Sequence, residues 1–135
     1  MGVPFKVKVI TPDKTLFDGE TEQIIVRSTE GDVGILANHI SYVSSIPSSP
    51  LKIKQSDGTY KVAAISGGMI KTSKDKTTII ATAAEWADEI DVDWAKRSEE
   101  DARNRLKIHN GGLEFERATL KLQRALNRLS VAQMK

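Results

Sequence analysis

Apolar and polar residues alternate in short runs along the first part of the chain. The run from Phe5 to Val9 alternates apolar residues with lysines, and residues 51–54 do the same before a Ser-Asp-Gly turn at 56–58. Alternation with a period of two predicts strands with one buried face, and two such runs around a short turn predict a β-hairpin. Repeated short strands with closely spaced turns favour an antiparallel β-sandwich or barrel.

A pair of glycines interrupts one of these apolar runs. Gly67 and Gly68 follow Ala-Ala-Ile-Ser and precede Met69. Because glycines inside a strand pattern mark breaks or close backbone approaches, we expect one strand to end here and another to begin at Met69.

The pattern changes at Asp91, where alanine, leucine and charged residues replace the β-branched ones. We expect a first helix over 92–108 with Asp91 as its N-cap, stopped by Asn-Gly-Gly at 110–112. A second helix carries small apolar residues at helical spacing, namely Ala118, Leu122, Ala125, Leu129 and Ala132. The sequence thus predicts an N-terminal antiparallel β-sandwich or barrel at 1–87 and a C-terminal two-helix antiparallel hairpin at 88–135. Because the first helix has few apolar residues, the hairpin is expected to be detachable.

Composition and charge exclude several classes of function. The net charge is +2 with a pI near 8.9, which lacks the concentrated basic field of nucleic-acid binding domains. Cysteine is absent, which excludes disulfides and thiolate chemistry. No apolar stretch approaches the roughly 20 residues that span a bilayer, so any membrane contact is expected to run through a partner.

Candidate catalytic and metal-binding patterns are weak. His39 and His109 are the only histidines, and neither has a ligand-like spacing. The glycines of 31–34 lack the lysine and hydroxyl residue of a phosphate-binding loop, so a turn between strands is the simpler interpretation. No acid, base and nucleophile occur together in a recognisable motif, so we expect neither catalytic residues nor a metal site.

Three stretches and the end of the chain resemble one known family in order and spacing. They are Val-Ile-Thr-Pro-Asp at 9–13, Gly-Asp-Val-Gly-Ile-Leu at 31–36, Ala-Ile-Ser-Gly-Gly at 64–68, and Arg-Ala-Leu-Asn-Arg-Leu at 124–129. Over essentially the whole chain, the sequence resembles the epsilon subunit of bacterial F-type ATP synthases.

The resemblance implies a non-catalytic rotor subunit in the central stalk of a proton-translocating complex at the cytoplasmic face of the cell membrane. The sandwich would dock on the gamma subunit and on the membrane rotor ring of c subunits, with Asp32 and His39 at the ring contact. The hairpin would extend toward the alpha and beta subunits of the catalytic head and inhibit ATP hydrolysis. A stand-alone nucleotide-sensing module is the alternative.

Four basic residues share one face of the second helix. Arg117, Lys121, Arg124 and Arg128 follow one another at offsets of four, three and four. Three interpretations remain open: a solvated face balanced by nearby glutamates, a contact with an acidic partner surface, or a contact with nucleotide phosphate. The family resemblance implies an inhibitory contact with an acidic loop on the catalytic subunits.

Some members of the family bind ATP between the sandwich and the folded hairpin, and their motif is partly present. Trp94 replaces the motif arginine, and Asp101 falls where another arginine can occur. The resemblance requires no cofactor and implies a weakened site for ATP as a regulatory ligand, formed by Glu85, Ile90, Asp91, Arg124 and Arg128. We expect Trp94 to be partly buried against the sandwich, with stacking on the base as the alternative.

Overall fold

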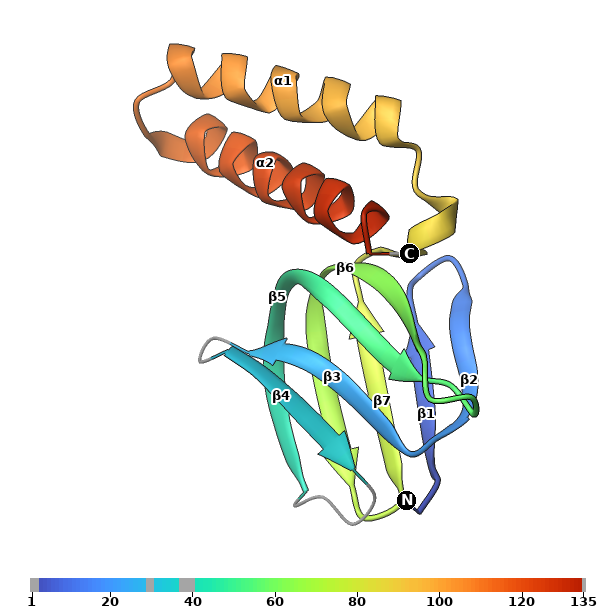
Figure 1. Cartoon of the computed structure of the whole chain (residues 1–135). Helices are drawn as coiled ribbons and strands as arrows, with labels where there is room; N and C mark the ends of the chain where they lie inside the picture. The colour runs from blue at the N-terminus through green and yellow to red at the C-terminus, as the bar shows by residue number, and fades with distance from the viewer. Residues whose placement is uncertain (1–2, 29–30, 37–40, 135) are drawn as a thin grey trace.

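The computed structural model describes residues 3–28, 31–36 and 41–134, and a strand-rich body precedes two helices (Figure 1). The strands are β1 (Phe5–Ile10), β2 (Thr15–Thr21), β3 (Gln23–Ser28), β4 (Gly31–Leu36), β5 (Tyr42–Lys54), β6 (Tyr60–Ser73), β7 (Lys76–Ala81) and β8 (Ala84–Trp86). A 3-10 turn, η1 (Ala87–Glu89), leads to α1 (Val92–Ile108) and α2 (Gly112–Ala132). The predicted sandwich followed by a helical hairpin is confirmed.

The strands pair in the order β2-β1-β7-β6-β5-β3-β4, with β8 paired to β6. The predicted hairpin at 51–64 is confirmed as the part of the long β5–β6 pair that adjoins its turn. Its turn is closed by Asp57, whose Oδ1 accepts a hydrogen bond from the backbone N–H of Thr59 at 2.9 Å. One pair departs from the antiparallel prediction, since β1 and β7 run parallel. These two strands are far apart in sequence, so no tight turn dictates their direction.

The glycine pair does not end a strand, so that prediction is wrong. Strand β6 continues through Gly67, which has a φ of 87°, a value that L-residues with side chains rarely adopt. A Cβ on Gly68 would lie 2.1 Å from the carbonyl oxygen of Ile80. The glycines therefore let β6 change partner, from β8 before them to β7 after them, while keeping its backbone close to β7.

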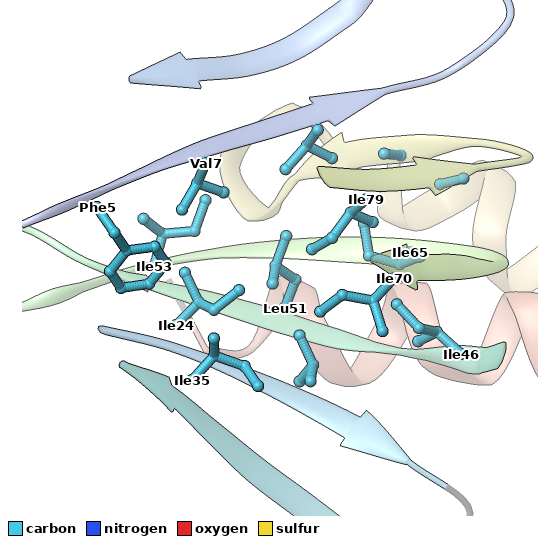
Figure 2. Close-up of a cluster of buried hydrophobic side chains, with 14 residues drawn as sticks. Phe5, Val7, Ile24, Ile35, Ile46, Leu51, Ile53, Ile65, Ile70 and Ile79 are labelled. Carbon is cyan, nitrogen blue, oxygen red and sulfur yellow. The ribbon is translucent and has the colours of Figure 1, made fainter. Parts of the chain in front are cut away.

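The main hydrophobic core lies between the strands (Figure 2). Its largest fully buried side chains are mostly β-branched, as expected for a pleated surface packed on one face. The buried members are Phe5, Val7, Val9, Ile24, Val26, Ile35, Ile46, Leu51, Ile53, Ile65, Ile70, Ile79, Ala81 and Ala84. Since all of them precede residue 85, the sandwich has a core that needs no helix.

The helical hairpin lies at one end of the sandwich, with α2 between α1 and the strands (Figure 1). The predicted N-cap is confirmed, because Asp91 Oδ1 accepts from the backbone N–H of Trp94 at 3.0 Å. The residues that α1 buries, Ala95, Ser98 and Ala102, are small. Ala118 and Ala125 of the predicted stripe are also fully buried, so small side chains allow the two helices to pack closely.

Candidate functional site

The junction between hairpin and sandwich brings together most of the residues singled out in the sequence. Its apolar part centres on Val131 of α2, which is fully buried against Val62, Ala64 and Ala87, with Ile90 packed alongside. Strand β6 is buried on both faces here, because Ile65, the residue after Ala64, belongs to the main core. The apolar junction is small, and its side chains are short.

Asn127 connects the hairpin to the sandwich through two hydrogen bonds. Its Nδ2 donates to the carbonyl oxygen of Ser49 at 3.2 Å and to that of Ile65 at 3.1 Å. Ser49 of β5 and Ile65 of β6 are directly paired, so a single amide bridges two neighbouring strands. Sequence reasoning missed this residue. The sequence did contain one signal: Asn127 is an amide residue one turn before Val131, on the same face of the helix.

Arg128 of α2 contacts both the sandwich and α1. Its Nε donates to Glu85 Oε1 in β8, and its guanidinium carbon lies 5.0 Å from the centre of the Trp94 ring in α1. The Arg128 side chain is only 14% exposed, and that of Glu85 is 31% exposed. Trp94 remains 48% exposed, so the expected burial against the sandwich is not found. Its ring is instead held by a cation–π contact with α2, because the guanidinium lies within reach of its face.

The four cations of the basic face are mostly paired in this folded state. Lys121 Nζ lies 2.5 Å from Asp101 Oδ2 and joins α2 to α1, while Arg117 pairs at 3.4 Å with Glu114 on its own helix. Arg128 has Glu85 as its partner. The half-buried Arg124 has no ion pair among the residues that the structure describes. The face is therefore engaged within the chain.

Asp101 is the acidic centre of the contact between the two helices. Its Oδ2 also lies 2.9 Å from Arg105 Nε, one turn along α1. The hydrogen bond from Lys121 lowers the pKa of the Asp101 carboxyl below its ordinary value of 3.8, and the charge of Arg105 lowers it further. Asp101, noted in the sequence as a departure from the expected ATP-binding motif, thus links the two helices.

The residues of the expected ATP site meet only in part. Glu85 and Arg128 are together, but as partners of each other. Asp91 accepts the N-terminal N–H of α1, and Ile90 packs on the apolar junction. Arg124 lies one turn before Arg128 on α2.

Of the two residues expected at the rotor ring, only Asp32 lies within the part of the chain that the structure describes. Asp32 of β4 is exposed and pairs with Arg27 of β3 at 3.0 Å. His39 lies outside the described residues. Within the described ranges, no helix is long and apolar enough to cross a membrane, and no group of three metal-ligating side chains forms.

The chain is a two-part protein. Its β-sandwich has a core of its own, and a helical hairpin is attached to it through a few apolar and polar contacts. Residues 4–87 match the family model of the ATP synthase delta/epsilon chain β-sandwich domain, and residues 88–133 match that of the delta/epsilon chain long α-helix domain. The ATP synthase epsilon chain of Ruminococcus albus is 48% identical over 132 residues, which cover 97% of this chain and 98% of the relative. That of Bacillus velezensis is 40% identical over 94% of this chain and 96% of the relative. The chain therefore belongs to the ATP synthase epsilon chain family.

Solved structures agree on the fold. A chain of the Euglena gracilis mitochondrial ATP synthase superimposes with a TM-score of 0.80 at 20% identity, over 96% of this chain and 80% of that one. A chain of the Tetrahymena thermophila mitochondrial ATP synthase central stalk and c-ring gives a TM-score of 0.63 at 16% identity, over 94% and 95%. At these identities, the likeness establishes the shared architecture.

Proposed function

We propose that the chain is a non-catalytic rotor subunit in the central stalk of a proton-translocating F-type ATP synthase. Its sandwich docks on the gamma subunit and the c-subunit ring at the cytoplasmic face of the cell membrane, with Asp32 and His39 at the ring. Its hairpin leaves the sandwich, extends toward the alpha and beta subunits, and restrains ATP hydrolysis. Family membership supports the first part of this proposal.

The observation that carries the proposal is the separation of the two cores. The main core uses residues 5–84, whereas the hairpin is attached through one turn of α2 that contains Asn127, Arg128 and Val131. A junction of this size is readily broken without unfolding the sandwich, because local opening exposes few apolar side chains. The fold therefore suits a fixed docking part and a mobile regulatory part.

Truncation tests this division. We expect the chain ending at Glu89 to keep its strand pairs and its main core, and to co-purify with the gamma subunit as the full chain does. Because truncation uncovers Val62 and Ala64, the variant Val62→Ser in the truncated chain controls for non-specific association. Complete loss of gamma binding in a truncated chain that keeps its β-sheet circular dichroism would refute the division.

The basic face is proposed to hold the extended hairpin against an acidic surface of the catalytic subunits. Changing all four cations to alanine should weaken inhibition of ATP hydrolysis and its salt sensitivity, but it also removes contacts of the folded state. The double change Arg117→Ala and Arg124→Ala is sharper, since neither side chain has an ion pair with the sandwich or α1 in the part of the chain that the structure describes. If the native chain and the double variant restrain ATP hydrolysis by the reconstituted complex equally, the proposed electrostatic contact is refuted.

A weak regulatory ATP site at the junction is the second part of the proposal. Glu85 and Asp91 would accept hydrogen bonds from the nucleoside, Ile90 would contact it, and Arg124 and Arg128 would face the phosphates. ATP binding there would favour the folded hairpin. Each missing charged contact costs about 1.5–3 kcal/mol, or roughly ten- to hundredfold in affinity.

Calorimetry on the isolated chain tests this site. We expect weak heat with millimolar ATP and tighter binding in Trp94→Arg, which restores a motif cation. The variant Arg103→Lys is the control, because Arg103 pairs with Glu99 on the exposed side of α1. Absence of heat in both the native chain and Trp94→Arg would remove the site.

A further inference from the structure

One arginine contacts all three parts of the molecule. Arg128 belongs to α2, donates to Glu85 of β8 in the sandwich, and lies 5.0 Å from the ring centre of Trp94 in α1. The guanidinium is thus bonded at its edge by a carboxylate and covered on its face by an indole, and its side chain is 14% exposed. Both arrangements suit a planar, delocalised cation, and partial burial strengthens them.

We propose that Glu85, Arg128 and Trp94 form a latch that keeps the hairpin folded on the sandwich without a bound ligand. This inference rests on the proposed function, because it states what regulates release of the inhibitory hairpin. Moving α2 off the sandwich separates Arg128 from Glu85, and separating the helices removes Arg128 from Trp94. Each step of opening therefore breaks one contact of the same side chain.

The apolar junction by itself is too small to decide the position of the hairpin. Besides Val131, it consists of a valine, two alanines and a half-buried isoleucine. Small side chains remove little apolar surface from water, so polar contacts contribute a large share of the docking free energy. The Asp101–Lys121 pair supports the latch by holding α1 and its Trp94 against α2.

The latch also defines what a ligand must do. A phosphate group that binds the Nε edge of Arg128 has to displace Glu85, whereas one that binds the opposite, Nη1/Nη2 edge can leave the Glu85 contact in place. Only an anionic nucleotide that takes the Nε edge therefore competes with the existing contact. The folded state precedes nucleotide binding and does not depend on it.

Because the chain contains no cysteine, two introduced cysteines can report the hairpin position. Lys74→Cys in the β6–β7 turn and Asn110→Cys between the helices are exposed sites for an energy-transfer dye pair. In the full chain without nucleotide, we expect one dominant population with the dye distance of the folded state. A dominant open population in nucleotide-free solution would overturn the proposal.

Variants of the three latch residues then measure their coupling. We expect Arg128→Gln and Glu85→Gln to raise the open-to-folded ratio about tenfold or more, and Trp94→Leu about two- to fivefold, with Trp94→Phe closer to the native chain. The matched control Arg103→Gln removes an arginine from an exposed pair within α1 and should leave the ratio unchanged.

The double variant of Trp94→Leu with Arg128→Gln should open the hairpin less than the product of the two single effects, because both remove the same contact. Independent effects, or a ratio unchanged by Trp94→Leu, would overturn the latch. This outcome is separate from the proposed function, which is tested by gamma binding and by ATP hydrolysis in the complex. A latched chain that binds no gamma subunit would refute the proposed function alone.

Discussion

Asn127→Asp tests the junction most directly, because it replaces an amide by a carboxylate of nearly the same shape. In the native chain the amide donates to two carbonyl oxygens at 3.2 and 3.1 Å, and Asn127 is only 9% exposed. The carboxylate has no donor, loses both hydrogen bonds and places a negative charge against two carbonyl dipoles. An uncompensated buried charge typically costs about 3–5 kcal/mol, so the hairpin should open by more than about a hundredfold.

Hydrogen–deuterium exchange measures this opening amide by amide. We expect exchange of α2 to accelerate strongly in Asn127→Asp while the core strands β5 and β6 stay protected, since the main core lies elsewhere. Asn104→Asp makes the same chemical change at an exposed position of α1 and should leave exchange at the junction unaltered. Lowering the pH should partly restore protection, because burial favours the neutral acid. Equal α2 exchange in the two variants would refute the assigned role of Asn127.

Three further outcomes follow from individual contacts. Val131→Ala removes two methyl groups from a fully buried site and should weaken hairpin docking by about 1–3 kcal/mol, seen as faster exchange in α2 with an unchanged sandwich. Gly68→Ala forces a Cβ onto a backbone carbonyl and should destabilise the sandwich by about 1–3 kcal/mol in urea unfolding, whereas Gly111→Ala, with open space around it, should have little effect. The pKa of the Asp101 carboxyl is lowered, so its bond with Lys121 stabilises the helix pair fully above the ordinary aspartate pKa, and this stabilisation is lost as the pH falls through the lowered pKa. Helix pairing that weakens between pH 6 and 8 instead would contradict the role given to Asp101.

Local features of the sequence predicted the elements well. Alternation and a Ser-Asp-Gly turn located the β5–β6 hairpin, and Asp91 located the start of α1, because these signals depend on residues that are adjacent in the chain. The role of Gly67 and Gly68 was missed, since a glycine that breaks a strand and one that admits a neighbouring backbone look alike in sequence. Only the partner strand distinguishes them.

The junction was harder to predict because its contacts join residues that are far apart in the chain. Asn127 meets two carbonyls only because Ser49 and Ile65 are in register, and register depends on the whole β5–β6 pair. The basic face was visible in the sequence, but its internal partners Glu85 and Asp101 were not.

The internal partners of the basic face give the proposed regulation a definite energetic form. Lys121 and Arg128 are bonded to Asp101 and Glu85 while the hairpin is folded, so neither is available to an acidic partner in that state. In the proposed regulation, Arg128 becomes available to the catalytic head when the hairpin leaves the sandwich, and Lys121 becomes available only when the two helices also separate. In the proposed regulation, the net free energy of inhibition is the contribution of the new ion pairs minus that of the internal ones, so it is smaller than the new ion pairs alone would give. An acidic surface on the head would then have to outweigh the internal contacts, and residue 94 would shift that balance through its contact with Arg128.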